Sequence, residues 1–201
     1  MPNILRVPQQ FAVSFAYNNV KHVMQTMGEE IIALKMYHVN DDAETHQRCG
    51  VCFEDVYQNT NSATCPYCYG TTFQGGVKEA WRIWAVFGDQ TEDLKKDKTG
   101  YWQNENHSVQ AEGYPMLQQD DYVIRVTAWD SSNQAPIDVG KYYRIGPVRP
   151  NSVRTGARFG GNNLDRIGQK FDAFVMPKGE VIYRYDVKTE INFPRYDGMQ
   201  R

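Results

Sequence analysis

All four cysteines of this 201-residue chain lie in two CxxC pairs, and their type and spacing point most directly to chemistry. Cys49 and Cys52 form the first pair, Cys65 and Cys68 form the second, and residues 53–64 separate them. A CxxC turn holds two sulfurs at the edge length of tetrahedral Zn–S coordination, so two such turns can close around one zinc ion. Four thiolates leave no open position for water, which predicts a structural zinc and not a catalytic one.

The residues around the cysteines fit a small zinc ribbon. Pro66, Gly50 and Gly70 suit tight turns that aim backbone amides at bound thiolates, and residues 53–64 are polar and turn-rich. In such a module the free energy of metal binding serves as folding energy.

Three other interpretations of this region remain open. The cysteines could form disulfides, although no secretory signal precedes them and an intracellular chain is kept reduced. They could be redox-active CxxC sites, although two facing pairs at ribbon spacing disfavour that. His46, three residues before Cys49, could replace a thiolate, but a solvated loop histidine is the favoured interpretation.

Length and composition limit the classes of protein. The length suffices for one sizeable core, or for one domain with an inserted module. The 22 Lys and Arg residues against 24 Asp and Glu residues give a net charge of −2, so no global basic field attracts nucleic acid. The 13 Tyr, 9 Phe and 4 Trp residues favour β-structure and protein interfaces. No apolar run of about 18 residues predicts a membrane span, and the lack of an N-terminal signal predicts the cytosol.

Hydrophobic periodicity predicts a mainly β fold with one N-terminal helix. Apolar residues at helical spacing predict a helix over 16–27, with Gly28 as its left-handed C-terminal residue, and residues 29–39 read as a strand that is apolar on both faces. Turn signals separate the further strands expected at 80–87, 122–129, 141–145, 171–176 and 181–187. Residues 131–140 are expected to form a turn region, and residues 88–106 a long loop or a hairpin with an extended tip. We therefore expect a small barrel or sandwich with an inserted zinc ribbon.

The predicted organisation has four parts. Residues 1–40 hold the N-terminal helix and strand of the main domain, 41–76 form the inserted ribbon, 77–188 form the β-barrel or sandwich, and 189–201 form an extended tail.

Arginines and aromatic residues mark two candidate contact regions. The glycine-rich loop expected at 156–168 is flanked by or contains Arg154, Arg158 and Arg166, but it lacks P-loop spacing and precedes no clear helix, so we reject a nucleotide site. In the tail, Phe193 and Tyr196 are candidate anchors on a neighbouring subunit.

No constellation for catalysis stands out. The four histidines lie near no HExxH, GxSxG or comparable motif, and thiolates committed to zinc are unavailable as nucleophiles. The sequence therefore predicts a protein that is not an enzyme, and an enzyme with a structural zinc ranks third among the hypotheses.

Two stretches resemble the neck proteins of tailed bacteriophages, the head-to-tail connector or stopper components. The strand GEEIIALKMYH leads into a ribbon whose second half, CPYCYGTTFQGGV, is similar to a CPxCYGTGFxGGY-like pattern, with Thr72 where glycine is usual and Val77 where an aromatic residue is usual. Further on, YRIGPVRPNSVRTGARFGG and the following residues 165–171 resemble the β-domain of the same proteins.

This resemblance implies a structural virion protein, assembled in the host cytoplasm. It would form a homo-oligomeric ring, by analogy six-fold, that joins the portal or adaptor protein of the head to the tail terminator or tail tube protein. The ring would help to retain or pass the genomic DNA. Arg154, Arg158 and Arg166 could then face the DNA channel or bridge subunits.

The alternative is a zinc-ribbon protein that binds nucleic acid. Such a protein should carry a basic face near its cysteines. Residues 41–70 instead hold five acidic residues and the single basic residue Arg48, which disfavours phosphate binding there.

Overall fold

The computed structural model describes residues 9–54, 59–60, 65–90, 94–97, 100–103, 106–131, 135–155 and 163–187. The helical elements are α1 (Gln9–Met27), α2 (Val39–Asp42) and the 3₁₀ turn η2 (Val181–Arg184). The strands of the main sheet are β1 (Glu29–Met36), β4 (Val77–Gln90), β7 (Asn106–Glu112), β8 (Tyr122–Trp129), β9 (Pro136–Ile145), β10 (Arg149–Thr155) and β11 (Asn163–Val175). Two small hairpins pair β2 (Phe53–Glu54) with β3 (Asn59–Thr60) and β5 (Leu94–Asp97) with β6 (Gly100–Gln103).

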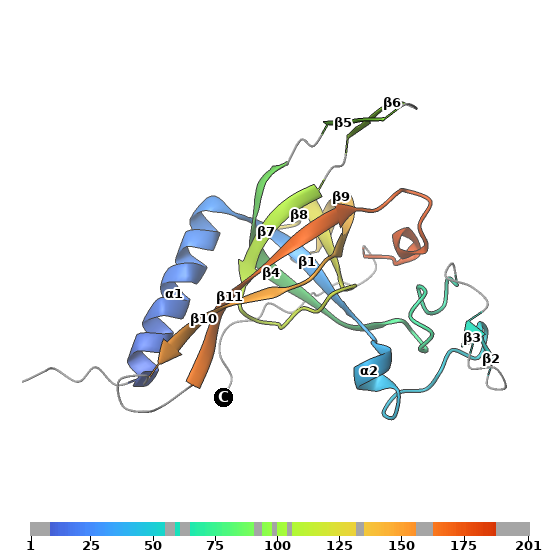
Figure 1. Cartoon of the computed structure of the whole chain (residues 1–201), viewed down its shortest axis with the longest axis horizontal. Coiled ribbons are helices and arrows are strands. Elements are labelled where there is room, and N and C mark those ends of the chain that lie inside the picture. The colour runs from blue at the N-terminus through green and yellow to red at the C-terminus, as the bar shows by residue number, and fades with distance from the viewer. Residues whose placement is uncertain are drawn as a thin grey trace, which may run out of the picture.

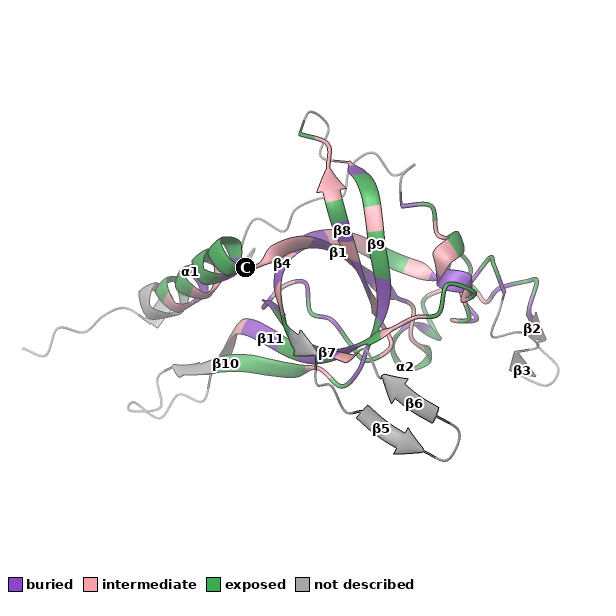
Figure 2. Cartoon of the chain, turned by 90° about the horizontal axis from the view of Figure 1, so that it is seen from above, coloured by how far each residue is buried: buried purple, intermediate pink, exposed green. Residues whose placement is uncertain are grey.

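The main sheet is antiparallel and closes into a barrel. Its strand order is β10-β11-β7-β4-β1-β8-β9, and the end of β11 also pairs with β9, where Ala173 faces Ile145. Figure 2 shows the ring of strands from above. Closure removes free edges from the strands between β11 and β9, while β10 extends the sheet beyond the ring along the first part of β11. The predicted mainly β fold is confirmed, and of its two expected forms the structure has the barrel.

One buried cluster fills the barrel. Alternate residues of every strand of the ring point inward, and small alanines stand among bulkier aromatic and branched side chains. The inward set is Ile31, Ala33, Ile83, Ala85, Val109, Ala111, Val123, Tyr143, Ile145, Phe171 and Ala173, and Leu117 joins it from the segment between β7 and β8. The barrel is therefore a packed core, which holds the strand ends rigidly.

A second cluster covers the outer face of β1, β8 and β9. Ile32 and Leu34 of β1 are fully buried there, as the apolar pattern on both faces predicts. Ile182 of η2 packs on this face, so the sequence prediction of a strand over 181–187 is wrong. Instead of joining a ladder, the amides of Tyr183 and Tyr185 bond locally to the carbonyls of Glu180 and Ile182.

Helix α1 lies against β11, β4 and β10 at one end of the barrel (Figure 1). It ends at Met27 as predicted but begins at Gln9, well before the predicted start. Gly28 does not have the left-handed conformation expected of it. Glycine is required because a Cβ here would lie 2.5 Å from the carbonyl oxygens of Met24 and Ala85. None of the described helices has the length and apolar character needed to cross a bilayer.

Other predicted elements keep their position but change their bounds. Strand β8 matches its prediction, whereas β9 and β11 begin earlier, so that parts of the expected turn at 131–140 and of the expected loop at 156–168 are strand. Strands β7 and β10 were not predicted. In the stretch 88–106 the β5–β6 pair bears out the hairpin alternative.

Candidate metal centre

The two cysteine turns meet at the end of the molecule opposite α1 (Figure 1). All four thiols are free and buried, and their sulfurs lie within 4.8 Å of one another. The Sγ atoms of Cys49 and Cys65 are 4.0 Å apart, and those of Cys52 and Cys68 are 3.3 Å apart. A tetrahedral centre with Zn–S bonds of about 2.3 Å has S–S edges of about 3.8 Å. The cluster can therefore hold one tetrahedral metal ion, in the place that the sequence predicts.

Backbone amides support the thiolate form of Cys65. Burial alone raises the pKa of Cys65, but hydrogen bonds from the amides of Tyr67 and Cys68 lower it to about 7. Burial and the neighbouring thiols raise the pKa of Cys52. Four crowded thiolates without a cation repel one another, so a bound metal ion would provide the charge that lets all four lose their protons.

Backbone contacts within the cysteine module, which we define as residues 41–76, set the shape of the cluster. The amide of Cys49 donates to the carbonyl of Thr72 at 2.8 Å, which joins the two turns. Gly76 (φ 65°) passes so close to the second turn that a Cβ would lie 2.4 Å from the carbonyl oxygen of Cys68. Thr72 itself has φ 73°, a left-handed conformation that favours glycine.

His46 lies outside the sulfur cluster. Its ring stacks on Tyr37 with a centroid distance of 3.9 Å, and its Nε2 lies 3.0 Å from the carbonyl oxygen of Gln74. It is half-buried. The sequence predicts a solvated loop histidine, whereas the structure has a half-buried ring that packs on Tyr37.

The structure describes only some of the other predicted site residues. Arg154 lies in β10 and Arg166 in β11, where the two strands pair. Arg158, Phe193 and Tyr196 lie outside the described residues. The structure therefore brings the cysteines together, while the predicted contacts of the tail stay predictions.

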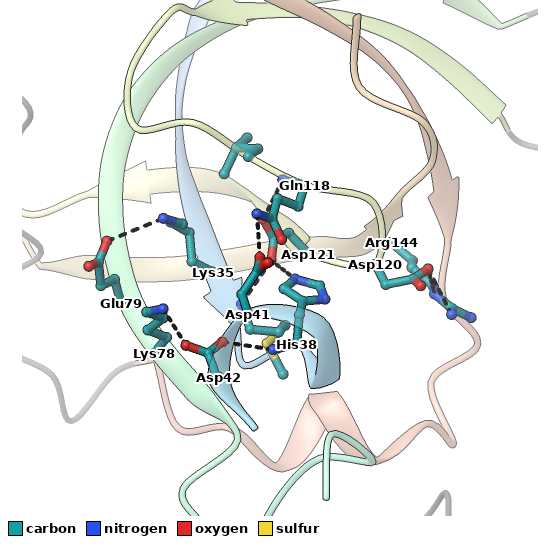
Figure 3. Close-up of polar contacts among 12 residues, drawn as sticks. Lys35, His38, Asp41, Asp42, Lys78, Glu79, Gln118, Asp120, Asp121 and Arg144 are labelled. Atoms are coloured by element: carbon teal, nitrogen blue, oxygen red, sulfur yellow. Dashed lines mark hydrogen bonds and ion pairs between the residues drawn. The ribbon is translucent and has the colours of Figure 1, made fainter. Parts of the chain in front are cut away.

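Two buried aspartates attach the module to the barrel, and sequence reasoning missed both. Asp121 is fully buried and accepts hydrogen bonds from the amides of Met36 (2.8 Å) and Gln118 (2.7 Å) and from the ring of His38 (3.0 Å). Figure 3 shows His38 between Asp121 and Asp42. A local pattern gives no signal for these contacts, because His38 and Asp121 are 83 positions apart in the chain.

Asp42 forms the other half of this attachment. Its carboxylate accepts hydrogen bonds from Lys78 Nζ at 2.5 Å and from the amide of His38 at 2.9 Å. Burial raises the pKa of Asp42, but these two bonds together lower it below its usual value. Since His38 precedes the module and Lys78 follows it, Asp42 ties the entering chain to the leaving chain.

A cavity of about 490 Å³ lies where the module meets the barrel. Its lining includes His38, Tyr69, Thr72, Asp120, Tyr122 and Glu180. Among the described residues, all three non-glycine residues with positive φ line it, namely Tyr69, Thr72 and Asp120. Such strain is common where a surface is shaped for a ligand or a partner.

Comparison with known proteins places the chain in no family. No protein-family model matches it, and no curated protein matches it. The functional argument therefore rests on its own residues and geometry.

Proposed function

We propose that this protein is a structural component of a tailed-phage neck. In this role it forms a ring that joins the portal or adaptor of the head to the tail and helps to retain or pass the genome. We take the metal to be zinc, and we propose a structural role and not a catalytic one, because four buried thiols supply a closed tetrahedral set.

The observation that carries the proposal is a closed, packed barrel with a different attachment at each end. Helix α1 and strand β10 lie at one end, and the cysteine module lies at the other (Figures 1 and 2). A ring requires two different, complementary surfaces on each rigid subunit. The resemblance of the module to the neck proteins supports the same function.

Light scattering on the purified protein, combined with elemental analysis for zinc, tests this proposal. We expect one zinc per chain and a ring-sized species, six-fold by analogy, whose wall and central opening electron microscopy would resolve. A zinc-bearing monomer that changes size only when duplex DNA or RNA is added would contradict the neck function and favour the nucleic-acid binder.

A further inference from the structure

Two exposed cations lie where β10 begins beside β11. Arg149 and Lys170 are exposed and directly opposite each other across the two strands. Neither side chain forms an ion pair or hydrogen bond with any residue that the structure describes. Like charges directly opposite on a sheet are destabilising. An anionic group from a partner would relieve this repulsion, so the Arg149–Lys170 pair is a candidate contact for a carboxylate.

The cavity between the cysteine module and the barrel contains a carboxylate of the opposite charge. Within the described part of the chain the carboxylate of Glu180 has no hydrogen-bond or ion-pair partner. The histidine and the other charged side chains of the lining itself have partners: Arg144 bonds to Asp120 at 2.8 Å, and His38 bonds to Asp121 (Figure 3). Glu180 is therefore the unbalanced charge of this cavity.

The cavity also has the lining that a basic side chain prefers. Tyr69 and Tyr122 lie in its wall beside Glu180. A carboxylate next to aromatic rings can bind an ammonium or guanidinium group both by ion pairing and by cation–π contact. A volume of about 490 Å³ accommodates a long basic side chain and part of the segment that carries it.

We propose that the paired start of β10 and its partner residues on β11 in one copy dock on this cavity of a second copy, with Arg149 or Lys170 paired to Glu180. The cations and the carboxylate lie on different parts of the chain, and in the structure Glu180 pairs with neither cation. The contact is head-to-tail and can repeat from subunit to subunit. The contact would supply a specific subunit interface for the proposed neck ring. It rests on the proposed neck function only for the claim that the repeated contact closes into a ring.

Charge reversal on each side of the proposed contact, studied by sedimentation of the full chain at low salt, tests the proposal. We expect E180K and the double variant R149E/K170E each to self-associate about tenfold more weakly than the parent or worse, because like charges then face each other. An equimolar mixture of the two should regain association, because the two variants can alternate and every contact between them again joins opposite charges. Combining all three changes in one chain should restore association.

The variant K178E is the matched control, because it reverses an exposed charge near the cavity without touching the proposed pair. It should associate like the parent, and far-ultraviolet circular dichroism checks that every variant is folded. If E180K and R149E/K170E both assemble like the parent, or if their mixture associates no better than either variant alone, the contact is wrong. If R149E/K170E only weakens binding to duplex DNA, the cations face nucleic acid, and the inference is also overturned.

The two proposals can fail separately. Regained association of the mixed variants, with no ring from the parent, would support the contact and contradict the neck function. Rings that form from the parent and also from both charge-reversed variants would support the neck function and contradict the contact.

Discussion

His38 Nε2 lies 3.0 Å from Oδ1 of Asp121, whose side chain is fully buried. His38 follows β1 at the entrance of the cysteine module, and Asp121 immediately precedes β8 of the barrel. This pair therefore couples the root of the module to the barrel core, and its protonation state affects how firmly the two are joined.

The His38 contact predicts that stability depends on pH. The hydrogen bond with Asp121 raises the pKa of His38; burial lowers it, but the nearby carboxylates raise it further. A pKa that is higher in the folded chain contributes stability that is fully present below the unfolded value, about 6.5, and is lost as the pH rises through the folded value.

We expect the variant H38Q to be less stable than the parent by about 1 kcal/mol at acidic pH, where the imidazolium bonds to the carboxylate. The deficit should shrink above the folded pKa. Urea unfolding at about pH 5.5 and about pH 8.5, on either side of the histidine titration, measures both values. An equal deficit at the two pH values would show that the titration of His38 does not contribute.

Asp120 and Asp121 are sequence neighbours with very different environments, which makes them a matched pair. The change D121N places an amide where two backbone amides and His38 require carboxylate oxygens, and the site is buried. We expect it to cost about 2–3 kcal/mol of unfolding free energy. D120N weakens an ion pair with Arg144 whose side chains are 46% and 50% exposed, and it should cost less than about 1 kcal/mol. Denaturant unfolding compares them, and similar losses would contradict the assignment of Asp121 as the structural anchor.

Metal removal should unfold the cysteine module while the barrel persists. The sulfurs form a buried cluster separate from the two apolar clusters of the barrel. A chelator, or the variant C68S, should therefore speed amide hydrogen exchange in the module and leave β1, β4 and β8 protected. Y67A changes an exposed side chain in the same turn and keeps all four thiols, so it should retain the metal. Equal loss of protection in the barrel strands would show that the two units unfold together.

Gly76 and Gly50 provide a second matched pair within the module. An added Cβ at Gly76 meets the Cys68 carbonyl oxygen at 2.4 Å and also requires a left-handed φ, whereas one at Gly50 meets nothing within 4 Å. We expect G76A to destabilise the metal-bound module by about 2 kcal/mol or more, and G50A to have little effect. Competition with a chromophoric chelator measures zinc affinity for each. Equal affinities would mean that the module relaxes around the added methyl group.

The sequence by itself determined the features that depend on nearby residues. The spacing of Cys49, Cys52, Cys65 and Cys68 identified the candidate metal centre, because a CxxC turn fixes its own two sulfurs. The apolar pattern on both faces of residues 29–39 identified β1, and the alternating pattern of residues 122–129 identified β8. The end of α1 at Met27 also followed from local periodicity.

Only the tertiary structure decided the features that depend on distant partners. The polar sequences of β7 and β10 do not read as strands; pairing with β11 makes them so. Residues 181–187 have the pattern of a strand, yet residues 181–184 form η2, whose Ile182 packs on an already paired sheet. The closure between β11 and β9, the anchoring of Asp121 and the cavity beside Glu180 all join segments far apart in the chain. No local pattern encodes such contacts, because their free energy arises only when the distant partner is in place.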